Sequence, residues 1–382
     1  MHGGQDCWWR GLWFSLAILL LVTATGCSDS QTPAGGSSAS GEGRQSAGAL
    51  LTDAQLRQRL DKAIDYTFNH RHLDTKVTAA WQVVHGILAF GPEFEVYSDG
   101  KLVSALDYLL KGGQLNGWNL RKGTHGVDAI LEAGSKTGQG HPDQWLGYLS
   151  QCGMPAETPL VVDREPFKIA DLITQAQWNI TQGMEATWTL MAFSSYVPLK
   201  SQWTSKDGTS WTVERIVDME ASQDINASPC GGSHRLYGLS VALNRHLAEG
   251  GKPTGPWQKA EEKIDFGIAK SKEFQEPNGS FSTKFFERPG TSSDVEQRLY
   301  ATGHTLEFLT MALKDDQLKE PWVTRAVDHL LGIIELTQDY DLECGKLYHA
   351  IHGLELYRMR RFGARPLPKP ASTATTQTGV AK

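Results

Sequence analysis

Apolar residues recur at helical spacing along most of the chain. Segment 52–70 places leucine, isoleucine and phenylalanine four residues apart on one face, after Thr52 and Gln55 in the spacing of a capping box. Segment 320–337 repeats the stripe, with Pro321 suited to a first helical turn. No stretch of comparable length alternates with period two. The pattern therefore predicts an all-α chain without a substantial sheet.

Two kinds of helical segment alternate along the chain. Each segment with a polar face is followed by one rich in Gly, Ala and bulky apolar residues, which we expect to be buried on several sides. The amphipathic segments are 52–70, 101–111, 167–180, 209–222, 255–272 and 320–337. The apolar segments begin at His85, His125, Glu185, His234, His304 and His349. Six outer and six inner helices predict an (α/α)6 toroid of six helical hairpins, with irregular repeat lengths.

The start of the chain has the composition of an export signal. Residues 11–22 form an apolar run after Arg10, too short to cross a bilayer comfortably as a permanent helix. Small residues then lead to Gly26 and Cys27, an arrangement that resembles the lipobox of bacterial lipoproteins. This resemblance implies lipidation of Cys27. The alternative is an ordinary signal peptide with an incidental cysteine.

These features predict four parts in the chain. They are a lipoprotein signal peptide at 1–26, a flexible Gly/Ser/Ala tether at 27–50, an α/α toroid domain at 51–362 and a disordered tail at 363–382. We therefore expect an exported protein that faces the periplasm or the exterior. An acyl chain such as palmitate on Cys27 would hold it to a bacterial membrane.

Charge and cysteine content narrow the partners. The formal net charge is −6, with 37 basic against 43 acidic residues and no long basic run, which argues against nucleic acid as a partner. Beyond Cys27, the chain has Cys152, Cys230 and Cys344 in an oxidising compartment. One disulfide with one free thiol is an open option, and the sequence does not identify the pairing.

Short turn motifs resemble those of terpenoid cyclases, which share an α/α toroid with the β-subunits of protein prenyltransferases. Each motif has glutamine, then glycine, then an aromatic residue. The three examples are Gln114 to Gly117 and Trp118, Gln202 to Gly208 and Trp211, and Gln275 to Gly279 and Phe281. The acidic motif of the cyclases and the zinc-binding Asp-x-Cys arrangement are absent, so the resemblance implies the fold and not the activity. Together with the lipobox, the stretches WQVVHGILAFG from Trp81, CGGSHRLYGL from Cys230 and ATGHTLEFL from Ala301 resemble a family of uncharacterised exported bacterial lipoproteins.

Histidines mark the start of most inner segments. Parallel inner helices would bring their N-termini together at one mouth, where unpaired N–H groups attract anions. Histidines gathered there could exchange protons near neutral pH, which is what general acid and base catalysis requires. The alternative is that each histidine only caps a turn or packs against a neighbouring loop.

A cysteine and two histidines suggest a metal site. Cys230 lies four residues before His234, and His304 lies within one helical turn of Glu307. Cys230, His234 and His304 could hold zinc, which takes sulfur and nitrogen ligands tetrahedrally. No paired-cysteine spacing supports this option. The preferred interpretation has no cofactor, with Cys230 in a disulfide or simply buried.

Segment 274–298 lacks a helical stripe and is long for a connection in a compact domain. It carries Phe281, Phe285, Phe286, Lys284 and Asp294, so it could close over the mouth and grip a ligand. A solvated insertion is the alternative.

The sequence predicts a membrane-tethered toroid with a histidine-rich mouth, and whether it is an enzyme stays open. The first hypothesis is an enzyme that acts on a polysaccharide or a similar polymer. The candidate catalytic residues are His234, His304, Glu307, Glu185 and Asp294, and the candidate ligand-binding residues are His85, His125, His349, Arg235 and Phe281. The alternative is a non-catalytic toroid that binds a ligand or a protein partner. Prenyl chemistry is disfavoured because its motifs are missing.

Overall fold

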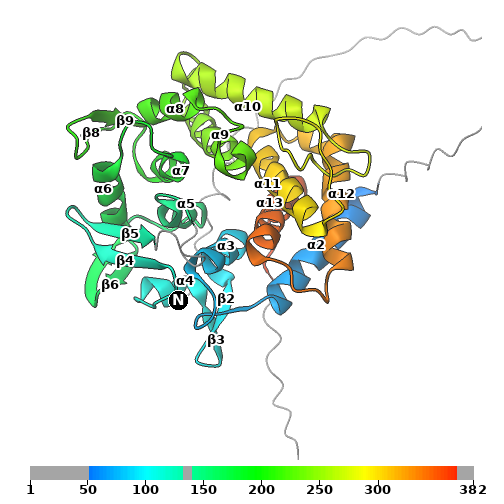
Figure 1. Cartoon of the computed structure of the whole chain (residues 1–382), viewed down its shortest axis with the longest axis horizontal. Helices are drawn as coiled ribbons and strands as arrows, with labels where there is room; N and C mark the ends of the chain where they lie inside the picture. Colours follow the sequence, from blue (N-terminus) through cyan, green and yellow to red (C-terminus); the bar gives the residue numbers. More distant parts are fainter. Residues whose placement is uncertain (1–50, 132–139, 368–382) are drawn as a thin grey trace, which may run out of the picture.

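The computed structural model describes residues 51–131 and 140–367 (Figure 1). The predicted signal peptide, Cys27, the tether and most of the predicted tail lie outside these residues. No helix within 51–131 and 140–367 is long and apolar enough to cross a membrane.

Helices make up most of the described chain. The first six are α2 (Asp53–His70), α3 (Ala80–Phe90), α4 (Ala105–Leu110), α5 (Gln144–Gln151), α6 (Ile169–Asn179) and α7 (Thr187–Tyr196). The others are α8 (Val213–Ser222), α9 (Ser233–Ala248), α10 (Pro256–Glu273), α11 (Val295–Ala312), α12 (Pro321–Leu336) and α13 (Cys344–Phe362). The mainly helical fold predicted from the apolar pattern is confirmed.

Six helices form a closed ring of contacts. Around this ring α3, α5, α7, α9, α11 and α13 each contact the next, and α13 contacts α3 again (Figure 1). Helices α2, α8, α10 and α12 pack on the outside of these six. The two groups differ as their sequences require. In α11 nearly every residue from Leu299 to Met311 is buried, whereas α10 buries only a stripe at intervals of three or four residues.

Small sheets interrupt the helices, which corrects the all-α prediction. The strands are β1 (Leu73–Asp74), β2 (Glu95–Ser98), β3 (Lys101–Ser104), β4 (Trp118–Lys122), β5 (Val127–Leu131), β6 (Pro159–Val162), β7 (Glu165–Lys168), β8 (Gln202–Thr204) and β9 (Ser210–Thr212). Four antiparallel hairpins pair β2 with β3, β4 with β5, β6 with β7 and β8 with β9. In the tightest turns, such as Asp99-Gly100, both residues have positive φ, as a two-residue hairpin demands.

The predicted inner helix that starts at His125 is wrong. Residues 127–131 form β5, which pairs along its whole length with β4. Gly126, at the turn, lies so close to α6 that a Cβ there would sit 2.0 Å from the backbone oxygen of Asp171. Strand pairing and this close approach therefore decide the local structure. The ring helix of this part of the chain is α5, which begins at Gln144.

The connection from α10 to α11 packs against the core. Gln275 donates from Nε2 to the backbone oxygens of Gly279, at 3.0 Å, and Trp322, at 2.7 Å, and so closes the turn. Phe281 and Phe286 are each 1% exposed. Phe281 lies edge-on to Trp322. The structure thus places these rings in the core, where they anchor the connection.

Candidate metal centre

Histidine side chains from four ring helices meet in the middle of the ring. They are His85 of α3, His234 of α9, His304 of α11 and His349 of α13. The ring centroids of His234 and His304 are 5.0 Å apart, and those of His304 and His349 are 3.9 Å apart. His234 lies in the first turn of its helix, but His304 lies in the middle of α11. The prediction that these histidines lie at helix N-termini is therefore correct for His234 but not for His304.

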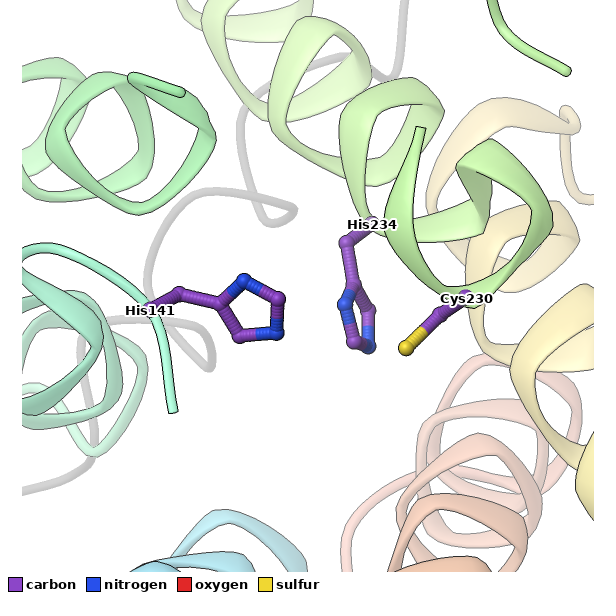
Figure 2. A group of neighbouring side chains, drawn as sticks. All are labelled: His141, Cys230 and His234. Atoms are coloured by element: carbon purple, nitrogen blue, oxygen red, sulfur yellow. The ribbon is translucent and has the colours of Figure 1, made fainter. Parts of the chain in front are cut away.

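His141, Cys230 and His234 form the outer site (Figure 2). One ligand atom from each residue lies within 4.8 Å of the other two. His141 comes from the segment before α5, whereas Cys230 and His234 flank the start of α9. His141 and Cys230 are half-buried and His234 is 4% exposed, so the outer site faces solvent on one side.

His234, His304 and His349 form the inner site. Their ligand atoms also lie within 4.8 Å of one another. All three side chains are buried, with His304 and His349 each 2% exposed. The inner site shares His234 with the outer site and lies deeper in the ring.

The backbone around Cys230 explains how the thiol reaches the outer site. Cys230, Gly231 and Gly232 all have positive φ, at 51°, 61° and 83°, which sends the chain through a left-handed turn into α9. A Cβ on Gly231 would lie 2.1 Å from the ring of Phe285, and one on Gly232 would lie 2.4 Å from Ile225. Glycine is therefore required at both positions. Holding a cysteine at positive φ is costly, and such strain is concentrated at functional sites.

Backbone carbonyls orient two of the buried rings. The Nδ1 atom of His304 donates to the carbonyl oxygen of Tyr300 at 2.9 Å, and that of His85 donates to the carbonyl oxygen of Trp81. A carbonyl oxygen can only accept, so Nδ1 carries the proton in both rings. In the neutral ring, Nε2 is then the atom with the lone pair.

Carboxylates orient the other rings. His141 donates from Nδ1 to Glu185 at 2.8 Å, and His349 donates from Nδ1 to Glu307 at 2.9 Å. The second oxygen of Glu307 accepts from Nδ1 of His352 at 2.5 Å. Burial acts to raise the pKa of Glu307, but His349 and His352 outweigh it and hold this pKa well below its usual value. A carboxylate or carbonyl behind Nδ1 is the usual support for a metal-binding histidine.

His234 differs from the other rings. Neither Nδ1 nor Nε2 has a hydrogen-bond partner among the residues that the structure describes. Two buried polar atoms without partners in one side chain are rare, because each costs free energy comparable to a lost hydrogen bond. His234 is also the residue common to both sites. Its two ring nitrogens could therefore bind a metal ion or another ligand.

Charges in the centre favour an ionised thiol. Burial acts to raise the pKa of Cys230, but His234, His141 and His304 together outweigh it and hold this pKa well below its usual value. Burial lowers the pKa of His85 to about 4, so this ring is neutral. Burial acts to lower the pKa of His141, but hydrogen bonds with Cys230 and Glu185 outweigh it and raise this pKa to about 9. A metal ion that bound His141 would therefore displace a proton from its ring. Sulfur and nitrogen donors in this combination suit Zn²⁺ and similar ions.

The structure places the predicted site residues in different surroundings. His234, His304, His349 and His85 meet in the centre. Glu185 and Glu307 lie directly behind it, hydrogen-bonded to its histidines. Asp294 is exposed and caps α11 by accepting from the backbone N–H of Glu296.

Two other predicted ligand residues have structural partners. His125 is exposed near the turn between β4 and β5 and stacks on Trp178, with ring centroids 3.8 Å apart. Arg235 is buried and donates from Nε to Glu220 at 2.9 Å. Neither His125 nor Arg235 belongs to the outer or the inner site.

His141 was missed by the sequence interpretation. It precedes α5 in the stretch GHPDQWLGYLS, where a histidine comes just before an apolar run. This is the same signal that singled out His234. It was overlooked because the inner helix of this part of the chain was assigned to the segment after His125.

Two of the remaining cysteines, Cys230 and Cys344, are free thiols in the described part of the chain. Cys344 accepts from Nε2 of Gln82 at 3.1 Å, and burial raises its pKa to about 12. Cys230 is thus distinguished from Cys344 by its surrounding histidines.

Comparison with known proteins adds no assignment. No family model, no curated protein and no solved structure matches this chain. The class of site therefore rests on the geometry alone, which groups histidines and a cysteine whose ligand atoms could hold a metal ion.

Proposed function

We propose that the chain is a metal-dependent enzyme whose ion is held by His141, Cys230 and His234. The observation that carries this proposal is His234, a buried ring with two unpaired nitrogens next to the thiol of Cys230 and the ring of His141. An ion bound there would give a ring nitrogen of His234 a partner and would also stabilise the thiolate of Cys230. Glu185 already orients the ring of His141 for this role.

The reaction type follows from the ligand set and its exposure. Three protein ligands leave the fourth position of a tetrahedral zinc ion open, which is the arrangement of catalytic rather than structural sites. The half-buried side of the outer site would give a substrate access to that position. Such an ion acts as a Lewis acid and activates water near neutral pH. We therefore propose hydrolysis as the reaction.

This proposal replaces the two-carboxylate mechanism expected for a polysaccharide hydrolase. A glycoside hydrolase needs one carboxyl group as acid and another as base or nucleophile. Both oxygens of Glu307 already accept hydrogen bonds from histidines, and Glu185 accepts one from His141. Asp294 is engaged as a helix cap. These contacts support a role in orienting histidines for Glu185 and Glu307 and a capping role for Asp294.

We also propose the finer architecture and the location expected from the sequence. The closed ring of six helices, with α2, α8, α10 and α12 outside it, supports a six-hairpin α/α toroid. The apolar run at 11–22 and the residues before Cys27 support an exported, lipid-anchored protein. The ring would then present its metal centre outside the cytoplasm.

Metal analysis of the full-length chain, purified without chelator, tests the proposed function. We expect at least one zinc ion per chain in the wild type and one ion fewer in C230S and H141A. The matched controls are C344S and H125A, which change a thiol and a histidine outside the centre and should keep the ion. Hydrolysis of ester and amide test substrates should stop with chelator and return with Zn²⁺. A wild-type chain without metal would overturn the proposal.

A further inference from the structure

We propose that the inner site binds a second metal ion and that His234 bridges the two ions. This inference rests on the proposed function, because it adds an ion to the same centre. The bridge would join an outer position made by Cys230 and His141 to an inner position made by His304 and His349.

The first argument comes from the protons of the inner site. Nδ1 of His304 and Nδ1 of His349 both donate to oxygen atoms behind them, at 2.9 Å each. In the neutral rings, both Nε2 atoms then carry lone pairs. The three ligand atoms of the inner site lie within 4.8 Å of one another and are buried. When all three rings are neutral, these lone pairs could bind a metal ion, which would replace any additional ring proton at the inner site.

The second argument comes from His234 itself. One nitrogen lone pair binds one ion, so a residue that serves both sites must use both nitrogens. Neither nitrogen of His234 has a protein partner in the described part of the chain, and the side chain is 4% exposed. Binding of both ions would release the remaining ring proton to solvent and leave an imidazolate between them. The other rings have one nitrogen already occupied by an oxygen acceptor.

The third argument is charge balance, since buried charge must be compensated. Two divalent ions bring four positive charges. The Cys230 thiolate, the His234 imidazolate and the carboxylates of Glu185 and Glu307 bring four negative charges. Glu307 lies behind the inner site and Glu185 lies behind the outer site, so each position has its own carboxylate.

The two positions would differ in chemistry. The outer position has a sulfur ligand and faces solvent, so it would meet the substrate. The inner position has nitrogen ligands only and lies in the core of the ring. An ion there would fix the orientation of His234 and hold its ring deprotonated. We therefore assign substrate binding to the outer ion and positioning to the inner ion.

Titration of the metal-free full-length chain with Co²⁺ separates the two positions. A thiolate ligand gives cobalt a charge-transfer band in the near ultraviolet, which the ion bound to Cys230 would produce. We expect two ions per chain in the wild type, together with this band. H349N should bind one ion and keep the band, whereas C230S should bind one ion without it. H125A is the control and should bind both ions.

The shared ligand is tested by H234N. This variant should weaken binding at both positions, whereas H349N and C230S each affect one. Retention of one ion at wild-type affinity in H234N would contradict the bridge. Far-ultraviolet circular dichroism of each variant checks folding, and H304N provides a second test of the inner site if H349N is unfolded.

The outcomes distinguish this inference from the proposed function. One ion per wild-type chain, with the thiolate band and no change in H349N, would overturn the second ion and leave the outer site intact. No bound ion in the wild type would overturn both. Alkylation of Cys230 by iodoacetamide in the metal-loaded protein, without loss of metal, would also exclude Cys230 as a ligand of the outer site.

Discussion

His234 and Arg235 are consecutive residues of α9, both buried, yet they have opposite surroundings. Arg235 donates from Nε to Glu220 at 2.9 Å and from Nη1 to the backbone oxygen of Asp224 at 3.3 Å and to Ser228. His234 has no hydrogen-bond partner among the described residues. The side chain of Arg235 thus makes several hydrogen bonds, whereas that of His234 makes ring contacts but no hydrogen bond in the described part of the chain.

The partner of Arg235 shows what a structural network looks like. Glu220 is 0% exposed and also accepts from the backbone N–H of Ala186, at 2.9 Å, and from the hydroxyl of Thr187, at 2.8 Å. It thereby ties α8 to the starts of α7 and α9. A buried polar network that is fully paired specifies a fold. Unpaired buried atoms, such as the two ring nitrogens of His234, are instead available to a further partner, which we propose to be a metal ion.

Removing Arg235 should produce the largest effect on stability. R235A leaves the Glu220 carboxylate buried without its charge partner, which costs about 3–5 kcal/mol of unfolding free energy. Denaturant unfolding of the full-length chain in chelator measures this loss. H234A, compared under the same conditions, removes a group without partners and should cost less. Equal losses would break the contrast between the two neighbours.

We expect bound metal to stabilise the chain only when His234 is present. Free Zn²⁺ at about 100 times its dissociation constant adds about 2.7 kcal/mol to the unfolding free energy for each independent site. The wild type should show at least this gain in thermal unfolding, and H234A should show none. A gain in H234A as large as that in the wild type would place the ion elsewhere.

The carboxylate behind the outer site should have a smaller effect on the ion. E185A removes the acceptor that orients His141, and loss of such a support lowers metal affinity about 10–100-fold. E157A is the matched control, because Glu157 pairs with Lys168 at the surface. Isothermal titration with Zn²⁺ compares the two variants. Unchanged affinity in E185A would indicate that His141 is not a ligand.

The smallest expected effect concerns an ion pair away from the centre. Hydrogen bonding from Lys346 lowers the pKa of Glu296 below its ordinary value of 4.5. A lowered pKa in the folded state stabilises the fold above the unfolded pKa, and this contribution is lost as the pH falls through the folded pKa. E296Q should therefore cost at most about 1 kcal/mol near pH 7 and less at more acidic pH. Urea unfolding of both chains at pH 7 and below pH 4 measures the difference.

Amphipathic helices were predictable because their signals are local. Segments 52–70, 255–272 and 320–337 correspond closely to α2, α10 and α12. First-turn residues mark where each helix begins, and the apolar stripe shows how far it extends. The hairpins were not predicted, since each strand has only three to five residues and depends on its partner. Trp203 and Trp211, for example, face each other across β8 and β9 but are eight residues apart in sequence.

The candidate centre was predicted in part, because only some of its residues have a local signal in the sequence. His234, His304 and Cys230 stood out because each lies next to an apolar run or a turn of glycines. The structure groups Cys230 with His141 and His234, and groups His304 with His349. That regrouping depends on which helices are neighbours in the ring, and no local pattern contains this information.

The closed ring has a consequence for the order of assembly. Segments far apart in the sequence supply the ligand atoms, from His141 before α5 to His349 on α13, and only the contact between α13 and α3 completes the circle. A partly folded chain has no such arrangement, so it could not bind an ion there before folding. Metal uptake would then follow folding and report that the last helix has docked.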